Sequence, residues 1–250
     1  MNKDIENVKQ ARESFDKILN NQVYADVIKD DNHLTLLLEM VRGRQYKRIL
    51  DIGTGTGYLA FPLGEEYPLA DVYGIDIAEN AIMKNKERAK EQGVENVMFQ
   101  VFNGMEYPFE EESFDLIVTR YAFHHFPDVH SAIQQMNRLL VQGGRILISD
   151  PMRNANDSLG MIDEFMRIKK DGHIQFYSQK ELDELFISSG FEKEKQIITN
   201  MSFPFPKKDE YLSLYQSVRN SDKNLYGILI ENDILWVKHI EVGNTIYVKK

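Results

Sequence analysis

The segment that decides the fold of this chain is Ile49-Leu50-Asp51-Ile52-Gly53-Thr54-Gly55-Thr56-Gly57-Tyr58. An apolar, strand-like run leads directly into three glycines at alternate positions, and an apolar helical pattern follows. Glycine permits a positive φ and close approach of a ligand to the backbone, and a strand-to-helix turn of this kind directs free amide N–H groups toward that ligand. The segment therefore predicts a loop that binds a nucleotide-type cofactor.

The spacing of these glycines differs from the dinucleotide fingerprint Gly-x-Gly-x-x-Gly. That fingerprint needs a third glycine where this chain has Tyr58, and the third glycine is instead Gly57. Asp51 lies two places before the first glycine, where a carboxylate accepts bonds from loop amides or from a cationic ligand group. A second apolar run ends near Asp76, at the distance where an acid binds ribose hydroxyls. We expect a ligand with a ribose and a cationic group but no pyrophosphate.

These motifs resemble those of the class I S-adenosylmethionine-dependent methyltransferases, in which an acid precedes Gly-x-Gly-x-Gly and a second acid ends the next strand. Asp51, the three glycines and Asp76 match that pattern. Phe102-Asn103-Gly104-Met105 resembles the family segment beside the adenine ring, with Asn103 where the family usually has Asp. The segments 121–128 and 139–148 look like the branch typified by ubiquinone and menaquinone biosynthesis methyltransferases. Several motifs in the right order are far more specific than any one of them.

The resemblance implies an α/β fold with a doubly wound, Rossmann-like, seven-stranded and mostly parallel sheet. The sequence pattern agrees, because strand-like segments alternate with helix-length ones, as in βαβ units. The expected strands of the core are 48–52, 72–77, 97–102, 116–119 and 145–149, and the expected helices between them are 58–66, 79–92 and 129–140.

The 250 residues are expected to form a single methyltransferase domain, 1–250. Its expected parts are an N-terminal helical lid, a cofactor-binding core, a substrate-side insertion after the fifth strand and a C-terminal completion of the sheet: 1–43, 44–150, 151–176 and 177–250. In the last part, Ser178 and Glu181 match a capping box that begins a helix. A sixth strand near 194–199, a helix near 209–219 and an antiparallel edge strand at 244–248 complete the expected order.

The resemblance also implies which residues bind the cofactor. Gly53, Gly55 and Gly57 would hold its methionine part, with Asp51 near the ammonium group. Asp76 would bind the ribose hydroxyls, and the adenine ring would be bordered by Ile77, Asn103, Gly104 and Met105.

Arg120 and Tyr58 complete the expected cofactor site, each with an alternative. Arg120 either binds the cofactor carboxylate or an acidic substrate, or forms a surface ion pair. The ring of Tyr58, like those of Tyr121 and Phe123, either faces the sulfonium or the acceptor, or serves only in packing.

Methyl transfer from a sulfonium mainly requires alignment and exclusion of water, and it needs a base only when the nucleophile arrives protonated. His125 and His124 are the candidate catalytic bases, because imidazole titrates near neutrality. In the alternative, one of the pair only fixes the loop before Pro127. Asp128 and His130 follow, but successive positions diverge in direction, so no metal site is expected.

In the insertion, polar residues are candidates for substrate contacts. Its apolar residues either form a wall of the substrate pocket or, as their helical spacing favours, ordinary core: Met161, Phe165, Met166 and Ile168. The polar candidates are Asp163, Glu164, Arg167 and His173.

Composition limits the class of function. The net charge of −9 disfavours a nucleic-acid partner, and the apolar runs are too short to span a membrane. The absence of cysteine suits a reducing cytoplasm. We expect a cytoplasmic monomer or homodimer that transfers a methyl group from S-adenosylmethionine to an oxygen, nitrogen or carbon of a small molecule and produces S-adenosylhomocysteine.

Three alternatives stay open. The first is methylation of RNA or protein, for which the basic stretch 42–48 would supply the RNA contact. The second is a nicotinamide-dependent oxidoreductase, which Tyr58 opposes. The third is a non-catalytic protein that binds S-adenosylmethionine.

Overall fold

The computed structural model describes residues 8–15, 30–206 and 208–250, and its centre is an eight-stranded sheet. The strands are β1 (Arg48–Ile52), β2 (Asp71–Asp76), β3 (Val97–Val101), β4 (Phe114–Arg120), β5 (Leu140–Pro151), β6 (Phe191–Pro206), β7 (Ile228–Glu231) and β8 (Ile234–Lys249). Their order is β3-β2-β1-β4-β5-β8-β6, and β7 pairs with β8 outside this path. The sheet thus contains one strand more than the seven expected.

The pairing within the sheet is parallel from β3 through β5 and antiparallel around β8. The helices are α3 (Asp31–Val41), α4 (Ala60–Glu66), α5 (Glu79–Gln92), α6 (Val129–Leu139), α7 (Met161–Arg167), α8 (Gln179–Ser188), α9 (Asp209–Ser217) and α10 (Asn220–Tyr226), with a short 3₁₀ turn, η1, at Phe123–His125. No helix in the described ranges is long and apolar enough to cross a membrane.

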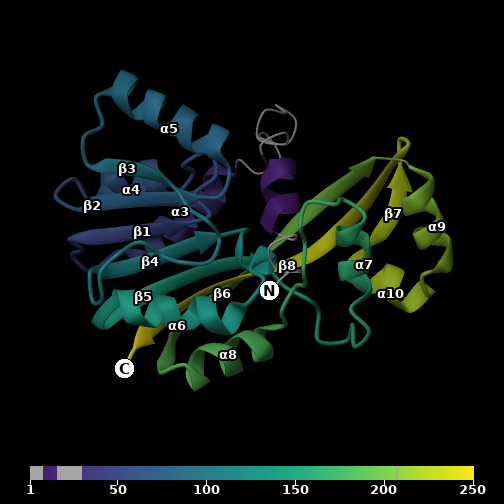
Figure 1. Ribbon diagram of the computed structural model, residues 1–250. Helices are drawn as coiled ribbons and strands as arrows, with labels where there is room; N and C mark the ends of the chain where they lie inside the picture. The colour runs from purple at the N-terminus through teal and green to yellow at the C-terminus, as the bar shows by residue number, and fades with distance from the viewer. Residues whose placement is uncertain (1–7, 16–29, 207) are drawn as a thin grey trace.

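Helices cover both faces of the sheet, as the doubly wound fold requires (Figure 1). Leu37 of α3, Leu63 of α4 and Ile82 of α5 belong to the core on one face. Ile133 of α6 and Phe186 of α8 belong to the core on the other face. The architecture confirms the expected Rossmann-like class, whose parallel strands all bring their carboxyl ends to one edge of the sheet.

The expectation of an edge strand at 244–248 is wrong. This segment is part of β8, which lies between β5 and β6, so that β6 occupies the edge. Ile246 and Tyr247 are consecutive and therefore point to opposite faces, yet both are fully buried, each in a different core. A strand buried on both faces belongs inside a sheet.

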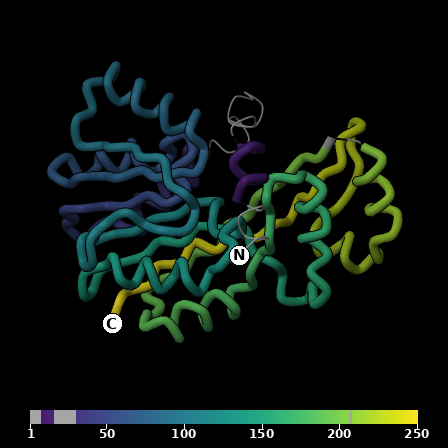
Figure 2. Tube along the Cα trace, in the orientation of Figure 1, coloured from purple at the N-terminus to yellow at the C-terminus, as the bar shows by residue number. Residues whose placement is uncertain are grey.

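The strands β6 and β8 extend beyond the core and enter a second lobe (Figures 1 and 2). Each strand is 16 residues long, and their far ends pack with β7, α7, α9 and α10 around a separate hydrophobic core. Phe165, Phe205, Tyr226 and Leu235 are among the buried members of this core. The sequence analysis assigned 177–250 to completion of the sheet, with two helices, and did not predict that part of it joins α7 in a second lobe.

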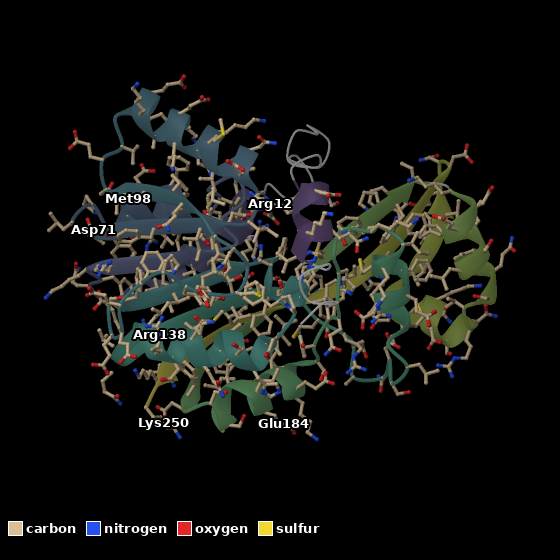
Figure 3. All side chains as sticks on the ribbon, viewed as in Figure 1. Arg12, Asp71, Met98, Arg138, Glu184 and Lys250 are labelled. Carbon is tan, nitrogen blue, oxygen red and sulfur yellow. The ribbon has the colours of Figure 1, made fainter. Side chains whose placement is uncertain are left out.

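The helical residues 8–15 lie between the core and the second lobe, with Arg12 on the side facing the core (Figure 3). Arg12 pairs with Glu79 at the start of α5, with 3.1 Å between Nη2 and Oε2. Together with α3, these residues are the described part of the helical lid expected at 1–43. Residues 1–7 and 16–29 of that segment lie outside the described residues.

Candidate functional site

A cavity of about 330 Å³ lies at the carboxyl ends of β1, β2 and β4, the edge at which open α/β sheets bind ligands. Its described walls come from the glycine loop, from the segments that follow β2, β3 and β4, and from the helical residues 8–15. None of the described lining residues belongs to 151–250. The sheet core and the N-terminal helix therefore form the cavity without side chains of the second lobe.

The three glycines of the loop have different physical reasons to be glycine. All have positive φ, at 73° for Gly53, 50° for Gly55 and 75° for Gly57. An added Cβ would lie 2.5 Å from Ala122 Cβ at Gly53 and 2.6 Å from Phe61 Cδ2 at Gly57, but it would meet nothing within 4 Å at Gly55. Gly53 and Gly57 thus permit internal packing, whereas Gly55 leaves open space where the loop lines the cavity.

The loop does not aim all of its amides at the cavity, contrary to the sequence expectation. Four of its N–H groups donate within the protein instead: three to acceptors of β2 and one to the carbonyl of Thr54 within the loop. The pairs are Gly53 N to Ile75 O (2.8 Å), Thr54 N to Ile75 O (3.0 Å), Gly55 N to Asp76 Oδ2 (2.8 Å) and Gly57 N to Thr54 O (2.8 Å). The loop therefore contributes to the cavity mainly through the shape of its backbone, and less through amide N–H groups that are free to donate to a ligand.

Two buried carboxyl groups line the cavity at the ends of β1 and β2. Asp51 is 2% exposed and accepts a 2.7 Å bond from the Thr54 hydroxyl. Burial raises the pKa of Asp51 to about 7, against the Thr54 bond and with a further contribution from Asp76. Asp76 accepts from the Ala78 amide at Oδ1 and from the Gly55 amide at Oδ2, both at 2.8 Å. The Asp76 carboxylate thus connects the glycine loop to the start of α5 at the cavity wall.

The segment after β3 presents Gly104 and Met105 to the cavity, and Ile77 joins them from the end of β2. Asn103 is absent from the described lining. Its side-chain oxygen accepts from the amides of Met105 (2.9 Å) and Glu106 (2.8 Å), a local turn that positions Gly104. The structure therefore gives Asn103 a loop-shaping position rather than a place in the cavity wall.

Arg120 lies between two tyrosine rings at the end of β4. Its Cζ is 3.8 Å from the ring centroid of Tyr58 and 4.0 Å from that of Tyr121, and its Nε donates to His33 Nδ1 at 3.3 Å. Tyr121 has φ 55°, a backbone conformation that few non-glycine residues adopt. Arg120 and Tyr121 also border a second cavity of about 320 Å³ between α3 and β6.

The two neighbouring histidines have different surroundings. His125 lines the cavity, and its ring is in edge-to-face contact with Phe15 at 5.0 Å between centroids. His124 is turned away from the cavity, with Nδ1 2.9 Å from Asp150 Oδ2. Burial lowers the pKa of both histidines well below the ordinary value, so both imidazoles are neutral near pH 7.

The polar residues of the insertion do not reach the cavity. Asp163 and His173 pair with one another, with 2.8 Å between Oδ1 and Nε2, and neither they nor Glu164 and Arg167 are among the described lining residues. Phe165 and its apolar neighbours form the core of the second lobe, as their helical spacing predicted. Within the described ranges, no cluster of His, Asp and Glu has the arrangement of a metal site.

The sequence interpretation missed several residues of the wall. Val8, Ala11 and Phe15 line the cavity, and their i, i+3, i+7 spacing is a helical signal that was available. Tyr107 and Phe126 also line it, but nothing in the local sequence distinguishes them from core aromatics.

Residues 44–219, more than half of the chain, match the model of a family described as "Methyltransferase domain". The methyltransferase YcgJ of Bacillus subtilis is 32% identical over 173 residues, which are 67% of this chain and 66% of YcgJ. A demethylmenaquinone methyltransferase of Thermus thermophilus is 36% identical over 102 residues, 41% of this chain and 46% of that protein. The chain thus spans less than two thirds of the length of these curated relatives.

The crystal structure of YcgJ has a similar fold. It superimposes with a TM-score of 0.77 over 88% of this chain and 99% of the YcgJ chain, at 23% sequence identity. At that level of identity the superposition establishes the shared architecture of the sheet and its helices.

Proposed function

Because this chain belongs to the methyltransferase-domain family, we propose that it transfers a methyl group from S-adenosylmethionine to an oxygen, nitrogen or carbon nucleophile of a small molecule. The product of the cofactor is S-adenosylhomocysteine. The observation that carries the proposal is the cavity in which the buried Asp51, the Asp76 carboxylate and the open space at Gly55 meet.

The described residues fit this cofactor. Asp51 and Asp76 both line the cavity, where a carboxyl group can accept from the ammonium group and from the ribose hydroxyls, respectively. Gly55 leaves room for the methionine part, while Ile77 and Met105 offer apolar surface to the adenine ring. When bound, the cofactor supplies a methyl group that is already activated by its positively charged sulfur.

The protein then has three tasks, for which the described residues supply groups. Asp51 and Asp76 orient the cofactor, and Val8, Ala11 and Phe15 of the N-terminal helix exclude water from one side of the cavity. An acceptor that arrives protonated also needs a base. Because the neutral His125 lines the cavity and His124 is bonded to Asp150, we assign that role to His125.

A small acceptor is favoured over RNA because two arginines of the basic stretch 42–48 form ion pairs within the protein. Arg42 pairs with Glu66 at 2.8 Å, and Arg44 lies 3.5 Å from Glu194. These ion pairs leave less positive charge for phosphates. The cytoplasmic location and the monomeric or homodimeric state remain predictions from the sequence.

Calorimetric titration with S-adenosylmethionine, S-adenosylhomocysteine and NADH tests the cofactor class. We expect binding of the first two without the third. Binding of NADH alone would overturn the proposal, and binding of the first two without methylation of any acceptor in a broad screen would favour a non-catalytic binding protein.

Asp76→Ala tests the ribose assignment. The variant should lose about 1 to 3 kcal/mol of cofactor binding energy, the range for hydrogen bonds to a charged group. Asp71→Ala is the matched control, because Asp71 is exposed at the opposite end of the same strand. Equal affinities of the two folded variants would contradict the assignment.

A further inference from the structure

The second cavity, of about 320 Å³, meets the cofactor cavity at Arg120 and Tyr121, which line both. Its other described walls come from Asp30, from α3 and from residues 199–202 of β6. A volume of this size lies at the lower end of the range for small-molecule sites. Most of its described lining residues are polar. The second cavity is therefore a small polar compartment beside the space proposed for the cofactor.

A chain of hydrogen bonds with a single direction links two walls of this compartment. A guanidinium can only donate, so Nδ1 of His33 accepts from Nε of Arg120 at 3.3 Å. His33 then carries its proton on Nε2 and donates to Asn244 Oδ1 at 2.8 Å. Asn244 Nδ2 in turn donates to Thr199 Oγ1 at 3.1 Å, and Thr199 keeps its O–H group as a donor. The two ends of the chain, Arg120 and Thr199, are donors that line the second cavity.

The middle of this chain is buried and therefore held in place before any ligand arrives. His33 is 6% exposed and Asn244 is fully buried, and the buried Ser149 hydroxyl adds a 2.8 Å bond to Asn244 Oδ1. Burial lowers the pKa of His33, and Arg120 lowers it further, so the ring is in the neutral form that the chain requires. The donors at both ends are thus positioned by the fold, as a binding site needs.

The charges of the compartment favour a ligand with a single negative charge. Arg120 is the cationic side chain among the described lining residues, and Asp30 is the anionic one. Asp30 caps α3, because its Oδ1 accepts from the amides of Asn32 and His33, each at 3.0 Å. One guanidinium beside this carboxylate suits a monoanion better than a phosphate ester, which carries about 1.5 to 2 negative charges. A planar carboxylate also matches the N–H fork of the guanidinium.

The backbone beside the compartment departs from regular geometry at two places. Tyr121 has φ 55°, and such non-glycine residues cluster at functional sites. The pairing of β6 with β8 shifts in register between Met201 and Phe203, and such irregularities are frequent next to active sites. Both irregularities lie at described walls of the second cavity. They are observations independent of the hydrogen-bond chain, and they point to the same compartment.

We propose that the second cavity is the acceptor site, and that the acceptor is a small monocarboxylate whose carboxylate accepts from Arg120 and from the Thr199 hydroxyl. The inference rests on the proposed methyl transfer and names its substrate class. The carboxylate serves to hold the acceptor, and the atom that receives the methyl group extends past Tyr121 toward the cofactor cavity. Arg120 then binds the acceptor and not the carboxylate of the cofactor.

Saturation-transfer NMR on the full-length protein, saturated with S-adenosylhomocysteine, tests this proposal. The probes are acetate, lactate and butyrate, each compared with its uncharged amide, and inorganic phosphate is the competitor. We expect at least one carboxylate to bind with a Kd of about 1 to 10 mM, and its amide to bind at least about tenfold more weakly. Phosphate at the same concentration should not displace that carboxylate.

Thr199→Val removes the hydroxyl donor and keeps the branched shape of the side chain. The variant should bind the carboxylate about fivefold more weakly or worse, the effect of one hydrogen bond to a charged group. Its affinity for S-adenosylhomocysteine should not change, because Thr199 does not line the cofactor cavity. Asn244 keeps the carbonyls of Ile197 and Val242 as acceptors. Thr35→Val is the matched control, because Thr35 is exposed on α3 and lines neither cavity.

Arg120→Gln should remove the preference for a carboxylate over its amide. The inference is overturned if no carboxylate is preferred in the wild type, if Thr199→Val binds it as the wild type does, or if phosphate displaces it. Carboxylate binding that disappears as S-adenosylhomocysteine is added would also overturn it, because Arg120 would then belong to the cofactor site. Calorimetry with S-adenosylhomocysteine is run on the same sample. Failure to bind there refutes the proposed function, whereas binding without a carboxylate preference refutes only the acceptor assignment.

Discussion

The carboxyl group of Asp51 predicts how cofactor binding depends on pH. Burial raises its pKa to about 7, and the ammonium group expected beside it favours the ionised form. Binding should therefore release a proton from Asp51 below this pH. We expect the affinity for S-adenosylhomocysteine to fall toward tenfold per pH unit below about pH 7, measured by calorimetry between pH 5.5 and 8. Asp51→Asn should remove this dependence, and an unchanged slope in that variant would contradict the assignment.

The same group predicts the direction of a stability change. The pKa of Asp51 in the folded protein lies above its ordinary value, so the folded state holds a proton that the unfolded state has released. The free energy of unfolding should then fall as the pH rises from about 4 to about 7. Denaturant unfolding of the wild type and of Asp51→Asn over this pH range isolates the contribution of Asp51. Burial also raises the pKa of Asp150, but Asp150 is present in both proteins and its contribution cancels in the comparison. A smaller decline in the variant is the expected outcome.

Two glycines of one loop should respond differently to alanine. At Gly57 an added Cβ collides with Phe61, so Gly57→Ala should lower the free energy of unfolding by about 1 to 3 kcal/mol or more. At Gly55 an added Cβ meets no protein atom, so Gly55→Ala should lower the free energy of unfolding by only about 1 to 2 kcal/mol, the cost of a left-handed backbone for alanine. The same methyl group would occupy space in the cavity and should therefore weaken cofactor binding at least tenfold. Thermal unfolding and calorimetry on both variants check this contrast. The reverse order of the two effects would mean that the cofactor does not occupy the space at Gly55.

The sequence motifs predicted which residues lie near the cavity better than they predicted which way each side chain points. Asp51 and Asp76 line the cavity, because a strand end fixes where its last side chains point, and Gly55 lines it from the loop. Asn103 does not, since its side chain bonds to the following amides. The contact between the rings of His173 and His125, whose centroids lie 6.2 Å apart, had no sequence signal, because it depends on how the insertion packs.

At the scale of elements, prediction was good where an element is bounded by clear chemical signals. The bounds of β1 and α5 were predicted as observed: an apolar run meets the glycine loop in the first case, and Gly93 with φ 64° ends the helix in the second. The strand β6 is longer than the predicted 194–199, because Asn200 and the prolines Pro204 and Pro206 interrupt the apolar pattern. The strand continues there because it pairs with β8, and the sequence of one segment does not reveal its pairing partner.

The capping box predicted for α8 is confirmed. The Ser178 amide donates to Glu181 Oε2 at 2.7 Å, and the Glu181 amide donates to Ser178 Oγ at 3.4 Å. Ser178→Ala should lower the free energy of unfolding by about 1 kcal/mol, because an amide of the first turn loses its acceptor. Urea unfolding measures the loss, and Ser188→Ala, at the other end of the helix, should cost less. Equal losses would show that the box does not stabilise this helix.

At the scale of the whole molecule, the second lobe should contribute to stability but not to cofactor binding. Leu235 is fully buried in the lobe core, and no described residue of the lobe lines the cofactor cavity. Leu235→Ala should lower the free energy of unfolding by about 2 to 5 kcal/mol, while the folded fraction binds S-adenosylhomocysteine with wild-type affinity. Ile230→Ala, at an exposed position of β7, is the control and should change neither quantity. A loss of affinity in Leu235→Ala would indicate coupling between lobe and cavity.

The overall class of the fold was predictable because local patterns alternate in a regular order along the core. The lobe was not, since its core joins segments such as 161–166, 205–211 and 226–240, which are far apart in the chain and individually resemble short helices or strands. Only their packing makes them one unit.

The position of β8 between β5 and β6 has a consequence for biosynthesis. A ribosome completes β5 and β6 before β8, so both neighbours leave the exit tunnel with unpaired backbone edges. Such edges pair readily with other chains. Until β8 emerges and inserts, these unpaired edges leave the nascent polypeptide open to pairing with other nascent chains. Translation pauses between β6 and β8 would prolong that vulnerable interval and lower the yield of native protein.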